Sequence, residues 1–340
     1  MKELHIEEKV PLSGLSTFKV GGEAHFVLHI ESEGQIKGAL QFAEEKNLPV
    51  LVLGGGSNML FSDNDFSGVV LKLEIMGKEV MEEDEKVLVK AGAGEEWDAF
   101  VAWTVGHGYF GLENLSGIPG TVGAAPIQNI GAYGVEAKDY IESVVVFDMK
   151  EGKVKTLSNI ECGFGYRTSV FKKESGKNFI VTSVTFSLSK VPDVKISYKD
   201  LSRFFEGRED ISSIDVRNAV IEIRRSKFPD LKTSGTAGSF WKNIITDSAN
   251  AERLLLEYPD MPVYDAPEGK KKISTAYILD KVCGLKDFRE GNVGLFTKQS
   301  LVVTNYGGAS SSEIRNFIAK VKSIVEEKTG IFLEEEVVIL

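Results

Sequence analysis

Cysteine is scarce in this chain, which has only Cys162 and Cys283 among 340 residues. Two thiols so far apart in sequence neither demand a disulfide framework nor provide metal-ligand spacing, so we expect both to be free. Histidine is also scarce, and no HExxH or other paired spacing links the four histidines, His5, His25, His29 and His107. The sequence therefore predicts no metal site.

Long apolar runs and excess positive charge are missing as well. No run is long enough to cross a bilayer and the N-terminus has no signal-peptide pattern, so we expect a cytoplasmic protein without a membrane partner. The net charge of −10 argues against nucleic acid, which requires a basic footprint. An anionic substrate must then be bound by local cations. The length favours two or three domains, and we expect a monomer.

Glycine and proline, in contrast, are concentrated in two places. Residues 117–134 read GIPGTVGAAPIQNIGAYG, and residues 54–58 read GGGSN after an apolar run that predicts a buried strand. Glycine admits a ligand where a Cβ would collide and proline fixes φ, so we expect ordered loops. The two clusters together predict one large, flat, phosphate-bearing cofactor held at two points.

Helix and strand patterns alternate in the first half of the chain. Ser32 is placed to cap a helix whose apolar face is Ile36, Ala39, Leu40 and Ala43. Residues 51–53 and 86–90 read as strands. Gly92 and Gly94 precede a helical pattern over 97–105 and resemble part of a dinucleotide fingerprint, but the third glycine and the ribose-binding acid are missing. Turn and helix-start chemistry explains these glycines adequately.

Antiparallel strands are predicted over 142–148 and 179–188, where β-branched and aromatic residues dominate. Residues 192–214 are polar and irregular, which suits a loop or lid, and we place a domain boundary near 214. A helix then starts at Ser213 and stops before Pro229. The last helix starts with the capping box of Ser310 and Glu313 and ends at Gly330, which leaves one short strand.

Six motifs occur in order along the chain: GGGSNML at 54–60, ENLSGIPGTVG at 113–123, QNIGAYG at 128–134, FGYRTSVFK at 164–172, FPD at 228–230 and AGSFWKN at 237–243. With these motifs the chain resembles the UDP-N-acetylenolpyruvoylglucosamine reductase (MurB) family over nearly its whole length. A loop around Tyr198 makes the resemblance type I. The implied fold is α+β: a two-lobed FAD-binding fold of the vanillyl-alcohol oxidase/PCMH type over 1–214, with lobes of about 1–70 and 71–214, and a smaller α+β substrate-binding domain over 215–340.

The resemblance also implies a reaction. NADPH passes hydride to FAD, and the enolpyruvyl ether of UDP-N-acetylglucosamine is reduced to UDP-N-acetylmuramate, a peptidoglycan precursor. No histidine or cysteine lies in either glycine segment, so we expect the FAD to be bound without a covalent link. Two other functions stay open: an oxidase of the same fold that acts on a sugar or alcohol, and a non-catalytic module that binds a nucleotide sugar.

Three residues match catalytic positions of the family: Arg167, Ser239 and Glu336. Taken alone, Arg167 could brace its turn, Ser239 could be an ordinary turn serine, and residues 334–336 could be charges on a solvated edge strand. Alternation in that strand would place Glu334 and Glu336 on one face and Glu335 on the other. The resemblance makes Arg167 and Glu336 stabilisers of developing charge, and Ser239 the proton donor.

Matching motif positions also imply the binding residues. Those for FAD are Gly54, Gly55, Gly56, Ser57, Asn58, Gly117, Ile118, Pro119, Gly120, Gly123, Ala124, Gln128, Asn129, Gly131 and Arg224. Those for the substrate are Tyr198, Lys227 and Asn243 at the UDP moiety and Tyr133 and Gln299 near the enolpyruvyl group. The chain departs from common family patterns at Ala124 and Ala125, at residues 296–298 and at Glu335.

Overall fold

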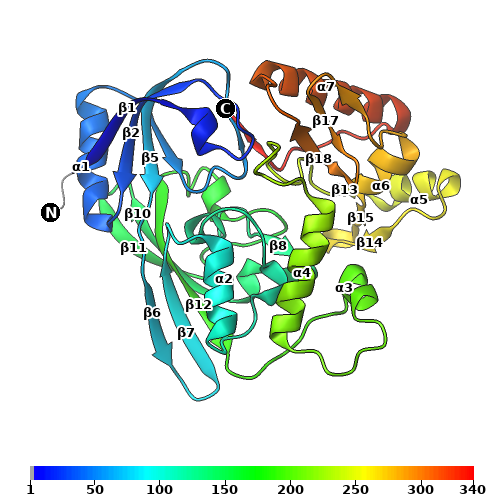
Figure 1. Ribbon diagram of the computed structural model, residues 1–340, viewed down its shortest axis with the longest axis horizontal. Helices are drawn as coiled ribbons and strands as arrows, with labels where there is room; N and C mark the ends of the chain where they lie inside the picture. Colours follow the sequence, from blue (N-terminus) through cyan, green and yellow to red (C-terminus); the bar gives the residue numbers. More distant parts are fainter. Residues whose placement is uncertain (1–3) are drawn as a thin grey trace. The chain divides into compact units, whose positions relative to one another are not determined.

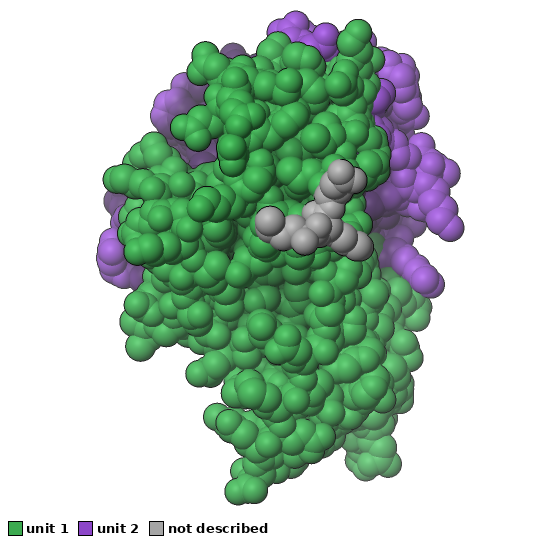
Figure 2. All heavy atoms as spheres, turned by 90° about the vertical axis from the view of Figure 1, so that its left-hand side faces the viewer, with its two compact units in different colours: residues 1–10, 23–56, 66–224 green, residues 11–22, 57–65, 225–340 purple. Residues whose placement is uncertain are grey.

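The computed structural model describes residues 4–340, and Cα packing divides them into two units. Unit 1 comprises residues up to Val10, Glu23–Gly56 and Phe66–Arg224, and unit 2 comprises Pro11–Gly22, Ser57–Asp65 and Arg225–Leu340 (Figure 2). The first glycine cluster is therefore shared, because its last two residues, Ser57 and Asn58, belong to unit 2. The boundary that the sequence places near residue 214 stays a prediction about folding domains.

Unit 1 begins with a four-stranded sheet in the order β1-β2-β5-β3, in which β5 is parallel to both β2 and β3. These strands are β1 (His5–Pro11), β2 (Glu23–Ile30), β3 (Val50–Leu53) and β5 (Phe66–Leu73). Helix α1 (Glu33–Glu45) packs against this sheet through Ile36, Ala39 and Ala43 (Figure 1). Ser32 forms a capping box with Gln35, so the expected helix start is confirmed.

A five-stranded antiparallel sheet forms the second layer of unit 1, in the order β11-β10-β12-β7-β6. Its strands are β6 (Lys78–Glu82), β7 (Lys86–Gly92), β10 (Ile141–Asp148), β11 (Lys153–Ser158) and β12 (Phe179–Ser189). Helix α2 (Trp97–Gly106) contributes Trp97 and Phe100 to the core beside Phe186. The strands expected at 86–90, 142–148 and 179–188 are thus confirmed.

The segment expected to be a polar, irregular loop contains helix α3 (Lys199–Phe204). Leu201 and Phe205 are buried against helix α4 (Ser213–Lys227) in one small apolar cluster with Tyr133. The sequence did not reveal this helix because only one of its residues, Leu201, is buried. Apolar packing therefore anchors α3 to unit 1, while Tyr198, the residue before α3, remains 46% exposed.

Unit 2 contains two small antiparallel sheets and a two-stranded parallel pair. The first sheet has β13 (Ile244–Thr246), β14 (Val263–Asp265) and β15 (Lys271–Ile273), and the second has β16 (Arg289–Glu290), β17 (Val293–Phe296) and β18 (Gln299–Asn305). β4 (Met59–Leu60) pairs with β19 (Val338–Ile339). The helices are α5 (Ser248–Glu257), α6 (Thr275–Tyr277), which continues as a π-helical turn over Ile278–Val282, and α7 (Ser311–Thr329).

Helix α7 begins and ends as its sequence predicts, with the Ser310–Glu313 capping box and a left-handed Gly330. The final strand does not. It covers only Val338–Ile339, and residues 334–336 form a separate extended segment before it, in which the expected alternation of the three glutamates holds. Their backbone pairs instead with residues 240–242, as described below.

Short elements complete the chain. The strands β8 and β9 and the 3₁₀ turns span Gly131–Ala132, Val135–Glu136, Leu12–Leu15, Glu113–Leu115, Val122–Ala124, Ala137–Asp139, Val170–Lys172 and Pro267–Gly269. Cys162 and Cys283 are buried free thiols, as expected. Among residues 4–340, no helix combines the length and apolar character needed to span a membrane.

Candidate active site

The two glycine clusters meet within unit 1. A Cβ added at Gly55 would lie 2.8 Å from the Cα atom of Gly120, and one added at Gly54 would lie 2.7 Å from Thr121 Oγ1. Contacts this short do not occur, so both positions need glycine for the loops to touch. The clusters are therefore adjacent, as expected, and these two glycines let the two loops contact each other.

Backbone hydrogen bonds fix the second cluster against the start of α2. Trp97 N donates to Gly120 O at 3.0 Å and Val122 N donates to Glu95 O at 2.9 Å. A Cβ at Gly123 would lie 2.6 Å from Ala93 Cβ, which explains why glycine is needed there as well. The segment is thus the ordered loop that its composition predicts.

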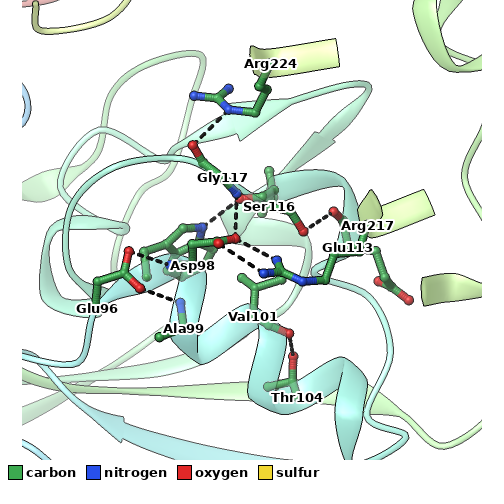
Figure 3. Close-up of polar contacts among 12 residues, drawn as sticks. Glu96, Asp98, Ala99, Val101, Thr104, Glu113, Ser116, Gly117, Arg217 and Arg224 are labelled. Carbon is green, nitrogen blue, oxygen red and sulfur yellow. Dashed lines mark hydrogen bonds and ion pairs between the residues drawn. The ribbon is translucent and has the colours of Figure 1, made fainter. Parts of the chain in front are cut away.

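Gly92 and Gly94 serve the packing of unit 1 and not a dinucleotide. A Cβ at Gly92 would lie 2.2 Å from Ile75 O, and one at Gly94 would lie 2.5 Å from the carbonyl carbon of Glu74. The first turn of α2 is capped by the carboxylate of Glu96, which accepts from Asp98 N and Ala99 N (Figure 3). A carboxylate already occupies the position where a phosphate would bind a helix N-terminus.

Gly117 is held between two helices by charged side chains (Figure 3). Asp98 of α2 accepts from Gly117 N at 2.7 Å, and Arg224 of α4 donates from Nε to Gly117 O at 2.9 Å. Burial raises the pKa of Asp98, but hydrogen bonds from Arg217 and Gly117 and the nearby arginine charges outweigh it and leave the pKa below its usual value. Burial lowers the pKa of Arg224.

Two polar groups at the clusters were missed by the sequence reasoning. Thr121 Oγ1 is buried beside Gly54 and has no hydrogen-bond partner among the described residues. Lys72 of β5 donates from Nζ to Gly54 O, and burial lowers the pKa of this lysine. In the sequence, the only sign of this role is that a charged residue, Lys72, follows the apolar run of β5. An unsatisfied hydroxyl and a cation at a glycine-rich loop suit a phosphate-bearing cofactor, so the site fits FAD.

Arg167 lies against the second glycine cluster. Its Nη2 donates to Gly131 O at 2.8 Å, and the residue has the left-handed φ of 52° in the tight turn Gly165–Thr168. Asn129 joins the same turn, because its Nδ2 donates to Gly165 O at 3.0 Å. The Asn129 side chain also forms hydrogen bonds with the Glu136 carboxylate and with Lys138 N. Any contact of Asn129 with FAD would therefore be made by its backbone.

Tyr133 and Tyr198 form an edge-to-face pair with ring centroids 5.5 Å apart. Tyr133 is only 9% exposed, and burial raises its pKa to about 12. Its hydroxyl therefore stays protonated at any working pH. The structure thus brings together two residues that the sequence assigns to opposite ends of the substrate.

Ser239 and Glu336 belong to neighbouring extended segments of unit 2. Ser239 forms a bridge with Val302 of β18, and the next residue, Phe240, accepts at its carbonyl from Glu336 N at 2.8 Å. Glu334 pairs with Lys242, and Glu335 pairs with Lys322 at 2.6 Å. The extended backbone therefore places Glu334 and Glu336 on one face and Glu335 on the other, as expected, and Glu334 and Glu335 have different partners.

Asn58 connects the first glycine cluster to this pair of segments. Its Nδ2 donates to Glu336 O at 3.1 Å, and its carbonyl accepts from Val338 N at 3.0 Å. Both atoms act on the backbone around Glu336, and both residues belong to unit 2. Asn58, which the sequence assigns to FAD, thus also positions the glutamate that the sequence assigns to catalysis.

The remaining substrate residues occupy separate elements. Lys227 is the last residue of α4, Gln299 opens β18 opposite Phe296, and Asn243 accepts at Oδ1 from Thr275 N at 3.3 Å. Gln299 and Phe296 flank a tight turn at Thr297 and Lys298, which is where the chain departs from the family pattern. Arg167, Tyr133, Tyr198 and Arg224 belong to unit 1, whereas Ser239, Glu336, Asn243, Lys227 and Gln299 belong to unit 2.

Comparison with known proteins matches both halves of the chain. Residues 24–158 match an FAD binding domain, and residues 230–340 match the C-terminal domain of UDP-N-acetylenolpyruvoylglucosamine reductase. The chain is 40% identical over 341 aligned residues to the reductase of that name from Chromobacterium violaceum, with 99% of each chain covered. The chain belongs to the UDP-N-acetylenolpyruvoylglucosamine reductase family.

Further relatives agree with this assignment. The reductase from Pseudomonas aeruginosa is 38% identical, with 98% of each chain covered. The crystal structure of the reductase from Thermus caldophilus has the same fold, with a TM-score of 0.69, 24% identity and 99% of each chain covered. The expected fold class, an FAD-binding domain followed by the family's C-terminal domain, is therefore confirmed.

Proposed function

We propose that the chain reduces the enolpyruvyl ether of UDP-N-acetylglucosamine to UDP-N-acetylmuramate with NADPH, as an FAD-dependent enzyme of peptidoglycan precursor synthesis. Family membership supports the reaction. The observation that carries the residue assignments is the backbone bond between Glu336 and Phe240, which keeps Glu336 beside the segment of Ser239. These two side chains have complementary roles in the same proposed step.

The glycine clusters of unit 1 would hold FAD, which supplies hydride transfer between NADPH and the substrate. Thr121 offers a buried hydroxyl and Lys72 a cation at the Gly54 loop. Gly56 and Gly120, with φ of 62° and 130°, allow backbone conformations that place N–H groups where other residues would be strained. No histidine or cysteine lies in either segment, so binding without a covalent link remains our prediction.

Arg167 and Glu336 would stabilise the substrate carboxylate as charge develops on it. An enol ether accepts hydride only if its conjugated carboxylate withdraws electron density. The guanidinium of Arg167 is a planar fork that matches a carboxylate with two charge-assisted hydrogen bonds. The left-handed φ of Arg167 and its bond to Gly131 O orient this fork before substrate binds. Such preorganised charge favours the transition state.

Ser239 would donate the proton that completes the reduction, at the carbon alpha to the carboxylate. Gly238, with φ of 78°, and the bond from Gly238 N to Thr236 Oγ1 form the tight turn before Ser239. Phe240 N donates to Leu301 O at 2.7 Å, which anchors the residue after it. These bonds fix the backbone on both sides of Ser239, from which its hydroxyl would reach the substrate for proton transfer.

The UDP part of the substrate would be bound by Tyr198, Lys227 and Asn243, with Lys227 at the diphosphate. Tyr133 and Gln299 would lie near the enolpyruvyl group. Tyr133 is protonated at working pH, so it can act as a hydrogen-bond donor. We assign the Tyr198 segment as the lid of a type I enzyme. A cytoplasmic location, a monomeric state and the consequences of Ala124, Phe296 and Glu335 stay predictions.

Product analysis tests this function directly. The purified protein should show a flavin absorption spectrum, and incubation with NADPH and the enolpyruvyl substrate should yield UDP-N-acetylmuramate with one NADPH consumed per product. Rapid reoxidation of the flavin by oxygen without that product would favour an oxidase. Purified protein that binds the nucleotide sugar but no flavin would favour a binding module instead.

A further inference from the structure

Asn114 connects the second glycine cluster to the segment that carries Tyr198. Its Nδ2 donates one hydrogen bond to Tyr133 O at 2.9 Å and another to Lys195 O at 2.8 Å. The side chain is 3% exposed, and all three residues belong to unit 1. The amide group therefore donates two hydrogen bonds, each to a carbonyl of a different segment.

The first acceptor lies where the backbone is strained. Tyr133 has a left-handed φ of 48°, which a bulky residue rarely adopts. The bond from Asn114 fixes the orientation of the Tyr133 carbonyl. The ring of the same tyrosine makes the edge-to-face contact with Tyr198. A change at Asn114 would thus act on the tyrosine pair without removing either ring.

The second acceptor lies at the base of the segment that bears Tyr198. Lys195 is three residues before Tyr198, and its ammonium lies 5.2 Å from the centroid of the Tyr140 ring. Beyond Tyr198, Leu201 and Phe205 are buried against α4. The segment is therefore held on both sides of Tyr198, by the Asn114 bond before it and by apolar packing after it.

We propose that Asn114 is a positioning residue that sets the closed geometry of the Tyr133–Tyr198 pair over the nucleotide. This inference rests on the proposed function, in which Tyr198 covers the UDP moiety. Asn114 itself need not contact the substrate, because its effect passes through the backbone of Tyr133 and Lys195. Its loss should weaken nucleotide binding while the flavin reaction with NADPH continues.

The test compares Asn114→Ala and Asn114→Ser in the flavin-loaded protein with a matched control, Asn159→Ala. Asn159 also donates two amide bonds to backbone carbonyls, Lys138 O at 2.8 Å and Ile141 O at 2.7 Å, and neither acceptor belongs to the Tyr198 segment. We expect the Asn114 variants to raise the Kd for UDP about 5- to 20-fold, as the loss of one or two buried hydrogen bonds predicts. Trypsin should also cut faster after Lys195 and Lys199.

Epistasis with Tyr198→Ala separates this role from a general loss of stability. If Asn114 acts through Tyr198, Asn114→Ala should change UDP affinity little in the Tyr198→Ala background. Equal effects in both backgrounds, or equal effects from Asn159→Ala, would overturn the inference. If Tyr198→Ala alone leaves UDP affinity unchanged, the lid in the proposed function is wrong. The rate of flavin reduction by NADPH confirms in each variant that the fold is intact.

A second, independent cluster lies on the edge of the first sheet, where β1 and β2 are neighbours. The Oε1 atom of Glu7 lies 3.7 Å from Nε2 of His5 and 3.3 Å from Nε2 of His29. These separations are close to the roughly 3.3 Å between ligands around a tetrahedral zinc ion with bonds of about 2.0 Å. The sequence shows no such spacing because the two histidines meet only across two strands.

The tautomer of His29 gives this cluster its ligand character. Nδ1 of His29 lies 2.9 Å from the carboxylate of Glu74, which can only accept, so Nδ1 donates. In the neutral ring, Nε2 then carries a lone pair, and it is buried and makes no hydrogen bond although a carboxylate is near. This histidine held by a carboxylate is the arrangement that orients metal-binding imidazoles.

The geometry points to a divalent transition-metal site formed by His5, Glu7 and His29, with Glu74 orienting His29. Titration of the tag-free, flavin-loaded protein with Zn²⁺ alone should show one ion per chain by calorimetry and a rise in Tm. Binding should be lost in His5→Ala and His29→Ala and retained in His25→Ala, a control on the same strand β2. No binding, or equal binding in all variants, would overturn the site.

Discussion

Asp98 binds the guanidinium of Arg217 with both carboxylate oxygens, at 2.6 and 3.0 Å. The pair joins α2 to α4, and Asp98 Oδ1 also accepts from Gly117 N at 2.7 Å. Gly117 O in turn accepts from Arg224 (Figure 3). Two helices therefore hold the first residue of the second glycine cluster through one carboxylate and two arginines.

Asp98→Asn should destabilise the protein in a pH-dependent way. The pKa of Asp98 is lowered in the folded state, so its stabilisation is complete above the unfolded pKa of about 3.9 and is lost as the pH falls through the folded pKa. At pH 7 we expect a loss of about 2 kcal/mol in the free energy of unfolding, and this difference should shrink below about pH 4. Urea unfolding of both proteins at pH 7 and pH 3 checks this. A difference that does not depend on pH would contradict the role of the ionised pair.

Acid precipitation should release all of the bound FAD. The two glycine segments contain neither histidine nor cysteine, the residues that most often carry a covalently linked flavin. The supernatant should carry the full flavin absorbance, and the pellet should be colourless. Mass spectrometry of the denatured chain gives the matching control. A chain heavier by one flavin would show that the cofactor is tethered.

Arg167→Lys should be severe although it keeps the charge. A lysine ammonium cannot form the two parallel hydrogen bonds of a guanidinium, and it cannot keep the bond from Nη2 to Gly131 O in the same position. We expect flavin reduction by NADPH to survive and reoxidation by the enolpyruvyl substrate to lose about 2 kcal/mol or more of transition-state stabilisation. Stopped-flow absorbance under anaerobic conditions separates the two steps.

Arg253→Lys is the matched control for this change. Arg253 also donates to a backbone carbonyl, Thr329 O at 2.6 Å, but it has no role in the proposed reaction. This variant should reoxidise at the parent rate. Near-native reoxidation in Arg167→Lys would remove Arg167 from the mechanism.

Tyr198→Ala should weaken substrate binding more than it slows the chemical step. Tyr198 is 46% exposed and contacts Tyr133 edge to face, so the exposed part of its side chain can cover a bound nucleotide. Lost contacts remote from the reacting atoms raise the Kd for UDP, and a modest fall in turnover follows from poorer positioning. Calorimetry with UDP measures the first effect. Tyr198→Phe, which keeps the ring, distinguishes loss of the aromatic contact from loss of the hydroxyl.

The regular elements of this fold are predictable because their signals are local. The capping boxes at Ser32 and Ser310 and the β-branched runs of β10 and β12 each act within a few residues. The failures involve partners distant in sequence. Residues 334–336 do not belong to the final strand β19 and pair instead with residues 240–242. Helix α3 is stabilised by packing against α4.

The same distinction applies to the site. Arg167, Ser239 and Glu336 lie in motifs that the sequence displays directly. Thr121, Lys72 and Asn114 do not, because their importance comes from atoms 18 to 81 residues away or from burial that only the fold creates. The requirement for glycine at positions 54 and 55 also depends on residues distant in sequence, because their close neighbours Thr121 and Gly120 lie in the other cluster.

Ser239→Ala tests the proposed mechanism most directly, because it removes the proton donor and barely changes the volume of the turn. In anaerobic stopped-flow experiments, NADPH should bleach the flavin of this variant at a near-native rate. Reoxidation by the enolpyruvyl substrate should slow by several orders of magnitude, since general acid catalysis alone is worth about 100- to 10,000-fold. Ser239→Cys should recover part of that rate through its thiol. Reoxidation of Ser239→Ala as fast as the parent, in single turnovers limited by the chemical step, would contradict the mechanism.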